Sequence, residues 1–226
     1  MNTETMTREQ LAGMFDHTYL KAFATEADFI KLCDEAKEIG AAMVAINSSP
    51  VRFCKEQLKG TKVHVGAAIS FPLGQTSIAT KVFETKNAIE EGADEIDYVI
   101  NIGELKNGNL AYIEEEMKQI VAACREKDIL IKVIFETCYL TEEEIVQVAE
   151  IAKRVKPDFI KTSTGFGTAG ATVEHVRLMK ETVGEEVQVK AAGGIRDWPT
   201  CKAMIEAGAT RIGTSASFAI LEGFGE

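Results

Sequence analysis

A short motif that recurs along the chain constrains the fold more than any other feature of the sequence. The pattern Glu-x-Gly-Ala-x-x-apolar begins at residues 38, 90 and 206, at intervals of 52 and 116 residues. Each copy follows a segment with helical periodicity and precedes an extended apolar run, and its glycine readily ends a helix in a left-handed conformation. The intervals are roughly two and four times a βα unit of just under 30 residues. The motif therefore predicts alternating strands and helices around a parallel sheet.

Filling in this period gives eight expected strands, with helices between them. Capping residues support the helices, because Thr25 with Asp28 and Thr141 with Glu144 each precede an apolar helical stripe. Eight units fit a (β/α)8 TIM barrel, which we expect to be a single domain over residues 1–226 with a short N-terminal helix. A doubly wound open sheet is the alternative, although the chain has no G-x-G-x-x-G motif. The expected strands lie near residues 14–18, 42–47, 63–69, 94–101, 129–136, 157–162, 187–191 and 209–213.

Charge and hydropathy exclude several classes of partner. The formal net charge of −10 argues against a binder of nucleic acid or anionic membranes, which would present a basic surface. No apolar run approaches the ~18 residues of a membrane span. The first residues have neither a basic nor an apolar region typical of a signal peptide, so we expect a cytoplasmic protein.

Cysteine and histidine spacing gives no sign of a metal site. The five cysteines are scattered without a C-x-x-C pair, and the three histidines form no H-E-x-x-H motif. Scattered cysteines are typical of reduced thiols in a reducing compartment. We expect His17 and His64 to be hydrogen-bonded structural residues rather than bases. The sequence therefore predicts no metal site.

Alternation along the expected strands places charged side chains inside the barrel. In the fourth strand Ile96 and Tyr98 share one face, while Glu95 and Asp97 share the other. The apolar faces must meet the helices, so the charged faces point inward. The inward set comprises Asp97, Lys132, Lys161 and Lys190, mostly near the carboxyl ends of the strands, where such barrels hold their active sites.

This cluster has two interpretations. One is a buried network of ion pairs that has no catalytic role. Against it, barrel interiors are usually aliphatic, and burying charges costs free energy. The other is a catalytic amine. Lys161 and Lys190 are 29 residues apart, which places them on neighbouring strands. Repulsion of roughly 3 kcal/mol between their ammonium groups, together with desolvation, predicts that one pKa falls to about 8 or lower. A free amine of this kind forms a Schiff base with a carbonyl, and Asp97 could relay protons.

Glycine-rich loops follow the same strands. They contain Gly165 after Lys161, Gly193 and Gly194 after Lys190, and Gly213 with Ser215 after the last strand. Such loops either bind phosphate through backbone N–H groups or simply make tight turns. Because three of them meet at one rim beside two inward lysines, we expect a phosphorylated substrate.

The motifs together resemble one enzyme family over essentially the whole chain. Residues 161–166 read Lys-Thr-Ser-Thr-Gly-Phe, residues 189–196 read Val-Lys-Ala-Ala-Gly-Gly-Ile-Arg, and residues 95–103 contain Glu-Ile-Asp. The segments 16–18, 71–74 and 132–137 match as well. In order and spacing these segments are similar to those of the deoxyribose-phosphate aldolases, which are class I aldolases.

The resemblance implies a reaction and roles for particular residues. The reaction is reversible cleavage of 2-deoxy-D-ribose 5-phosphate to D-glyceraldehyde 3-phosphate and acetaldehyde, in deoxyribonucleoside breakdown and without a metal or organic cofactor. Lys161 matches the Schiff-base lysine, while Lys190 and Asp97 match the proton-transfer residues. Lys132 matches a lysine that pairs with that carboxylate, and Asp16 an aspartate at the floor of the site. The phosphate contacts match Gly165, Gly193, Gly194, Gly213 and Ser215. The resemblance also implies a cytoplasmic homodimer or homotetramer.

Two positions depart from the family pattern, and two other functions remain open. Ala45 stands where some members have cysteine, and Phe166 stands where some have a lysine, so phosphate binding would depend more on backbone amides. A Schiff-base enzyme acting on a keto acid or ketose phosphate is one alternative. It should carry a cationic clamp for the carboxylate, for which only Arg196 is evident. A catalytically silent barrel that senses a sugar phosphate is the other.

Overall fold

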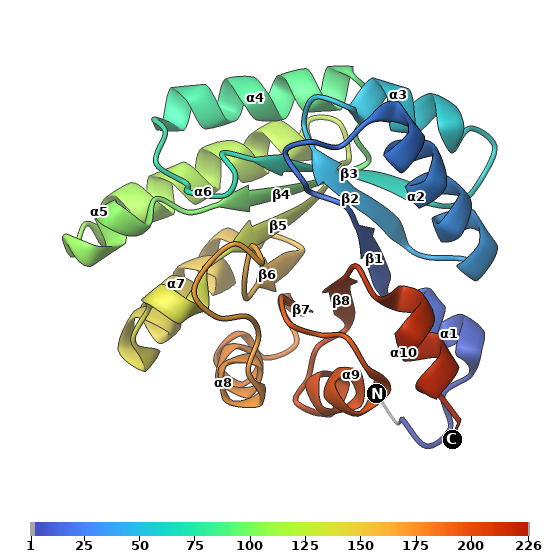
Figure 1. The fold of residues 1–226 in the computed structure, drawn as a ribbon. Helices are drawn as coiled ribbons and strands as arrows, with labels where there is room; N and C mark the ends of the chain where they lie inside the picture. Colours follow the sequence, from blue (N-terminus) through green and yellow to red (C-terminus); the bar gives the residue numbers. More distant parts are fainter. Residues whose placement is uncertain (1–2, 226) are drawn as a thin grey trace.

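The eight expected strands form a closed barrel, which confirms the (β/α)8 fold and excludes the open sheet. The structure is a computed structural model that describes residues 3–225. All neighbouring strands are parallel, and the first pairs with the last. Figure 1 looks into the barrel, with the helices arranged around its outside. The strands are β1 (Phe15–Thr18), β2 (Met43–Asn47), β3 (His64–Ile69), β4 (Glu95–Val99), β5 (Leu130–Ile134), β6 (Phe159–Lys161), β7 (Gln188–Ala192) and β8 (Arg211–Thr214).

Helices connect successive strands, and two elements lie outside the simple alternation. The short expected N-terminal helix is present as α1, which packs beside the C-terminal helix α10 (Figure 1). An additional helix, α5, follows β4 before the main connecting helix α6. The helices are α1 (Arg8–Ala12), α2 (Glu26–Ile39), α3 (Val51–Gln57), α4 (Ile78–Glu90), α5 (Ile102–Lys106), α6 (Leu110–Arg125), α7 (Glu142–Val155), α8 (Val173–Val183), α9 (Trp198–Glu206) and α10 (Ser217–Gly223), with a 3₁₀ turn at Thr137–Tyr139. Within residues 3–225, no helix has the length and apolar character needed to cross a membrane.

The expected helix signals act as the sequence predicts. Thr25 and Asp28 form a capping box at the start of α2, and Thr141 and Glu144 form another at the start of α7. The glycine of the first repeated motif, Gly40, ends α2 with φ of 70°, a conformation that costs glycine little. These local signals fix where α2 begins and ends and where α7 begins.

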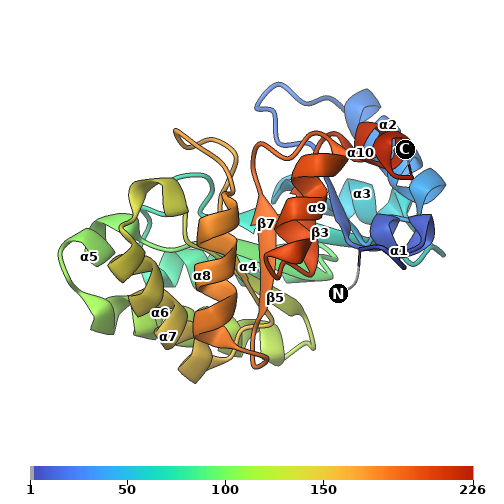
Figure 2. The same ribbon diagram turned by 90° about the horizontal axis from the view of Figure 1, so that it is seen from below.

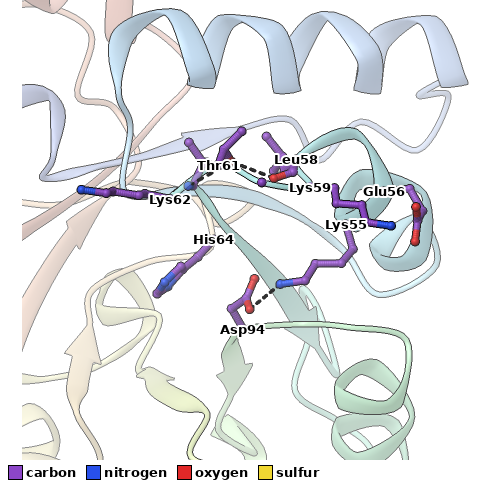
Figure 3. A pocket seen from close by; sticks show the side chains of 10 residues that line it. Lys55, Glu56, Leu58, Lys59, Thr61, Lys62, His64 and Asp94 are labelled. Carbon is purple, nitrogen blue, oxygen red and sulfur yellow. Dashed lines mark hydrogen bonds and ion pairs between the residues drawn. The ribbon is translucent and has the colours of Figure 1, made fainter.

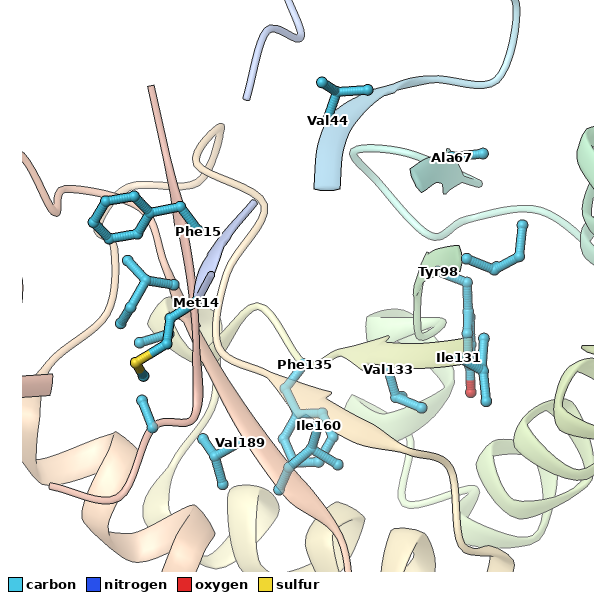
Figure 4. Close-up of a cluster of buried hydrophobic side chains, with 14 of the residues drawn as sticks. Met14, Phe15, Val44, Ala67, Tyr98, Ile131, Val133, Phe135, Ile160 and Val189 are labelled. Carbon is cyan, nitrogen blue, oxygen red and sulfur yellow. The ribbon is translucent and has the colours of Figure 1, made fainter. Parts of the chain in front are cut away.

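The main hydrophobic core lies between the strands and the surrounding helices. Outward-facing side chains such as Val133, Ile160 and Val189 are fully buried there, as Figure 4 shows for part of this cluster. Burying each such side chain contributes roughly 1.5–3 kcal/mol. The alternation expected from the sequence is confirmed, because Ile96 and Tyr98 belong to this outer core while Asp97 points into the barrel. The polar interior is thus enclosed by an apolar shell that supplies the stability.

One buried ion pair lies outside the barrel, where α4, α6 and the end of β4 meet. The Nζ of Lys81 lies 2.6 Å from Oε1 of Glu116 and 2.6 Å from the carbonyl oxygen of Val99. Oε2 of Glu116 accepts a hydrogen bond from the backbone N–H of Asn101. Neither charged side chain is exposed to solvent. This pair fixes the carboxyl end of the strand that carries Asp97.

We expect Glu116→Leu to lower the free energy of unfolding by about 3–5 kcal/mol, because the substitution leaves the charge of Lys81 buried without a partner. The double variant Lys81→Met/Glu116→Leu should recover most of this loss, since it leaves no buried charge. Urea denaturation of the two variants and the wild type measures both effects. A single variant as stable as the wild type would contradict the expectation.

Candidate active site

Asp97 lies at the centre of the barrel interior and receives three lysine side chains. Its Oδ1 accepts a hydrogen bond from Nζ of Lys132 at 2.9 Å. Its Oδ2 accepts from Nζ of Lys161 at 2.8 Å and from Nζ of Lys190 at 2.7 Å. Lys190 also forms an ion pair with Asp16 on β1, the first strand of the barrel. The four residues predicted to point inward therefore meet, together with Asp16, in one cluster.

The strand register explains this convergence. Lys161 on β6 is directly opposite Lys190 on β7, and Asp97 on β4 is directly opposite Lys132 on β5. Side chains on paired residues point to the same face of a sheet, and in a closed barrel that face is the interior. The predicted adjacency of Lys161 and Lys190 is thus present, and their amines share one carboxylate oxygen.

Lys161 is the amine best suited to act as a nucleophile. Burial lowers its pKa to about 8, and the neighbouring ammonium of Lys190 acts in the same direction, while Asp97 opposes both. A similar pKa was expected from the sequence, with repulsion by Lys190 as the larger cause of the shift. In the structure burial is the larger cause, because Asp97 lies between the two amines and offsets much of their repulsion.

The charges of the interior balance when Lys161 is neutral. Three further cations and three anions are buried there, and every one of these side chains is 11% exposed or less. A protonated Lys161 adds an unmatched positive charge, which costs free energy in a medium of low dielectric. This balance makes Lys161 easier to deprotonate than an ordinary lysine. The matched groups are Lys132, Lys190 and Arg211 with Asp16, Glu95 and Asp97.

Lys132 joins Asp97 to a second carboxylate. Its Nζ contacts Glu95 as well as Asp97, and these carboxylates raise its pKa although burial favours the neutral form. Lys132, Lys161 and Lys190 together hold the pKa of Asp97 well below its ordinary value, although burial opposes this. Asp97 is thus an anion at neutral pH, and Lys132 is a permanent cation that orients it.

Arg211 also belongs to this network, although it was not among the residues predicted from the sequence. Its guanidinium donates a hydrogen bond to Oδ1 of Asp16 at 2.8 Å and another to Oε1 of Glu95 at 3.3 Å. Alternation along β8 carries the signal, since Arg211 and Gly213 share a face. Arg211 opens a strand of only four residues, so the pattern there was too short to be noticed.

The cluster opens into a cavity of about 650 Å³ at the carboxyl ends of the strands. The loops after β1, β6 and β7 gather at this end of the barrel, as Figure 2 shows. Lys161 and Lys190 line the cavity floor. All five glycine and serine positions expected to contact phosphate also line it, namely Gly165, Gly193, Gly194, Gly213 and Ser215.

Close backbone packing explains the glycines of these loops. A side chain at Gly170 would approach the carbonyl oxygen of Gly193 within 2.1 Å, so the loops after β6 and β7 contact each other through their backbones. Gly193 itself has φ of 86°, which other residues rarely adopt. The loops therefore need glycine for tight turns, and this need is compatible with anion binding by their backbone N–H groups.

The cavity rim carries both an exposed aromatic residue and two cationic side chains. Phe166 is 52% exposed, and its ring packs edge-on against Phe71 at a centroid distance of 5.5 Å. Lys21 and Arg196 also line the cavity, and within residues 3–225 neither side chain forms an ion pair. An anionic group of a ligand in this cavity could therefore pair with Lys21 or Arg196.

Glu136 holds the loop that follows Lys161. The fifth strand was expected to reach residue 136, but Glu136 lies beyond the end of β5 in a left-handed conformation, with φ of 55°. Its buried carboxylate accepts hydrogen bonds from the backbone N–H of Thr164, at 3.3 Å, and from the hydroxyl of the same residue. Strained backbone at such a position is typical of a functional loop.

The histidines and cysteines behave mostly as expected. His17 is buried and contacts Ser217 and Glu35, each at 2.9 Å, although its ring also borders the cavity. His64 contacts Glu95 at 2.8 Å. The cysteines are free thiols, and all are buried except the partly exposed Cys138. In the described part of the chain, no group of three or more His, Cys, Asp or Glu side chains is arranged to hold a metal ion.

Comparison with known proteins identifies the family. The model of the DeoC/LacD family aldolases matches residues 11–222. The chain is 59% identical to a deoxyribose-phosphate aldolase from Lactobacillus acidophilus, over 96% of this chain and 91% of the relative. It is 53% identical to one from Bacteroides thetaiotaomicron, over 96% and 92%.

Solved structures agree with this assignment. A putative deoxyribose-phosphate aldolase from Coccidioides immitis superimposes with a TM-score of 0.92 at 36% identity, over 96% of this chain and 86% of that one. A tetrameric deoxyribose phosphate aldolase from Aeropyrum pernix superimposes with a TM-score of 0.90 at 29% identity, over 96% and 92%. Orotidine 5'-phosphate decarboxylase from Pyrococcus horikoshii, at 16% identity and a TM-score of 0.64, shares the fold alone.

Proposed function

Because the chain belongs to the DeoC/LacD family of aldolases and is a lyase related to the deoxyribose-phosphate aldolases, we propose that it reversibly cleaves 2-deoxy-D-ribose 5-phosphate. The products are D-glyceraldehyde 3-phosphate and acetaldehyde, and the reaction passes through a Schiff base on Lys161. The single observation that carries this proposal is the amine of Lys161. It is buried beside Asp97 and Lys190, it borders the cavity, and its pKa is lowered to about 8.

The chemistry begins with the neutral amine of Lys161. The amine attacks the aldehyde carbon of the open-chain sugar, and loss of water leaves a protonated imine. Removal of the proton from the hydroxyl on C3 breaks the bond between C2 and C3 and releases glyceraldehyde 3-phosphate. The bonding electrons pass to the imine as an enamine. Protonation of the enamine at C2 and hydrolysis then release acetaldehyde and restore the amine.

Asp97 and Lys190 are the proposed proton carriers for these steps. Oδ2 of Asp97 lies within hydrogen-bond distance of both amines, so a proton can move between Lys161 and Lys190 through this carboxylate or through a water beside it. Lys132 and Asp16 support the pair, since Lys132 holds Oδ1 of Asp97 and Asp16 holds Lys190. Because its pKa is low, Asp97 remains an anion at neutral pH, where it orients both amines and a water that can carry the proton between them.

We further propose that the glycine-rich loops bind the substrate phosphate. The lining of one cavity by Gly165, Gly193, Gly194, Gly213 and Ser215 supports this assignment. Backbone N–H groups in such loops bind anions without a charged side chain, which suits a chain that has Phe166 where other members have a lysine. Arg196 and Lys21 add positive charge at the rim.

The biological setting is also a proposal. We propose one barrel domain acting as a cytoplasmic homodimer or homotetramer in deoxyribonucleoside breakdown. The tetrameric assembly of the relative from Aeropyrum pernix supports an oligomer. Size-exclusion chromatography with light scattering measures the assembly directly.

Borohydride trapping tests the mechanism. Acetaldehyde with sodium borohydride should leave one ethyl group on the enzyme, and peptide mapping should find it on Lys161. Pyruvate in place of acetaldehyde should leave no adduct. A pyruvate adduct in place of the acetaldehyde adduct would support a keto-acid aldolase, and the absence of any adduct with acetaldehyde or the sugar phosphate would support a silent sugar-phosphate sensor.

A further inference from the structure

The end of the barrel opposite the active site holds a second cavity that contains a titratable side chain. This cavity has a volume of about 520 Å³, and His64, the first residue of β3, lies at its wall with 46% of its side chain exposed (Figure 3). The imidazole is therefore accessible to protons from solution. Nothing in the proposed reaction uses this end of the barrel.

An unbroken series of charged contacts leads from His64 to the reactive amine. Nδ1 of His64 lies 2.8 Å from Oε1 of Glu95, and Oε2 of Glu95 contacts Nζ of Lys132. Lys132 in turn donates to Oδ1 of Asp97 at 2.9 Å, and Oδ2 of Asp97 accepts from Lys161 at 2.8 Å. The side chains of Glu95 and Lys132 are fully buried, so solvent screens these interactions little.

Charges of both signs surround His64. The hydrogen bond from His64 to Glu95 raises the pKa of the imidazole above its ordinary value, with Asp94 acting in the same direction, while burial and Arg211 oppose this. Asp94 is itself paired with Lys55 at 2.5 Å. Histidine is the side chain that ordinarily changes charge between pH 5 and 8, so the half-exposed imidazole of His64 can respond to pH in this range. The charged groups around the imidazole are Glu95 and Asp94 from the β4 segment, Arg211 from β8, and Lys55, Glu56, Lys59 and Lys62 from α3 and the loop after it.

We propose that His64 is a positioning residue that senses pH at the far end of the barrel and, through Glu95 and Lys132, adjusts how strongly Asp97 holds the amine of Lys161. When His64 is protonated, it shares the negative charge of Glu95, so Glu95 attracts Lys132 less. Lys132 then pairs more strongly with Asp97, which consequently stabilises a protonated Lys161 less. The added positive charge at Glu95 disfavours a protonated Lys161 directly as well.

This coupling has a physiological consequence that rests on the proposed function. Acidification protonates Lys161 and removes the nucleophile. A simultaneous gain of charge at His64 opposes that loss, so the fraction of free amine falls less steeply below neutral pH than it would without His64. His64 would thus preserve part of the Schiff-base activity in mildly acidic conditions.

The variant His64→Gln tests the proposal, because glutamine can still donate a hydrogen bond to Glu95 but cannot carry charge. Competitive labelling with acetic anhydride, read by peptide mass spectrometry, measures the neutral fraction of Lys161 as a function of pH. Between pH 6 and 7 we expect Lys161 in the variant to react about threefold more slowly than in the wild type, equivalent to roughly half a pKa unit. Above the pKa of Lys161 the two proteins should react equally.

Two further variants separate charge from structure. His64→Arg keeps a positive charge beside Glu95, so labelling of Lys161 between pH 6 and 7 should equal or exceed that of the wild type. His175→Gln removes a histidine on α8, outside the barrel, and should leave the labelling profile unchanged. Thermal unfolding checks that each variant is folded.

Equal labelling of Lys161 in His64→Gln and the wild type would overturn the proposal, as would an equal decrease in His64→Gln and His64→Arg. Because acetic anhydride reports on the amine itself, the outcome does not depend on aldolase chemistry. If borohydride trapping failed while the labelling difference persisted, the proposed function would be wrong and the coupling would stand. If trapping were normal while His64→Gln and the wild type had identical labelling profiles, the proposed function would stand and the coupling would be wrong.

Discussion

Lys161→Ala should reduce cleavage of 2-deoxy-D-ribose 5-phosphate by about 10⁴-fold or more, because it removes the only group that forms the covalent intermediate. The fold should survive the substitution. Lys132, Lys190 and Arg211 still balance Asp16, Glu95 and Asp97, and water from the cavity can fill the space that the side chain leaves. Coupled assays that detect glyceraldehyde 3-phosphate measure the turnover, and circular dichroism measures the fold.

A surface lysine gives the matched control. Lys118 lies on the outer helix α6 and pairs with Glu114 at the surface, so Lys118→Ala changes the charge of the chain equally but leaves the reactive cluster intact. Its turnover should equal that of the wild type. Residual activity of Lys161→Ala above about 1% of wild type, or a borohydride adduct on Lys190, would show that another amine is the nucleophile.

The architecture could be predicted because it depends on local, repeated signals. Each repeated motif combines a helix-ending glycine with the following strand, and Thr25 and Thr141 fix the starts of two helices through capping boxes. Such signals act within a few residues and survive in the folded protein. The strands differ from their expected limits by a few residues at most, as at β4, which ends at Val99 rather than near residue 101.

The centre of the site could also be predicted, because alternation along a strand fixes the face that each side chain occupies. Asp97, Lys132, Lys161 and Lys190 are brought together as alternation and spacing indicated. Beyond the end of a strand the side chains no longer alternate, so their positions could not be predicted in this way. Glu136 lies past the end of its strand, and its left-handed backbone follows no strand pattern.

Longer-range pairings were harder to predict. Arg211 meets Asp16 across 195 residues of sequence, and the balance of pKa effects at Lys161 depends on the depth of burial. Neither quantity is encoded in spacing along one strand. The sequence therefore predicts which residues share the interior, whereas the structure is needed to state which of their interactions dominates.

Asp97→Asn should separate the availability of the amine from proton transfer. Asp97 raises the pKa of Lys161, so its neutralisation should lower that pKa below about 8 and make the amine more reactive toward acetic anhydride at pH 7. Cleavage should nevertheless fall by about 10²–10⁴-fold, because an amide cannot carry protons between the two lysines. Compared with the wild type, Asp97→Asn should thus have a larger fraction of neutral Lys161 but a lower rate of cleavage.

Two measurements decide between the roles of Asp97. Competitive labelling follows the neutral fraction of Lys161, and steady-state kinetics follow kcat for the sugar phosphate, with Asn101→Ser near the carboxyl end of the same strand as a control for local disturbance. Turnover retained by Asp97→Asn would contradict a role in proton transfer. A loss of labelling that parallels the loss of turnover would instead mean that the carboxylate mainly holds the amine in position. Faster labelling combined with slower cleavage is the result that the geometry favours, because one oxygen of Asp97 contacts both amines and so affects both the charge of Lys161 and the path of its proton.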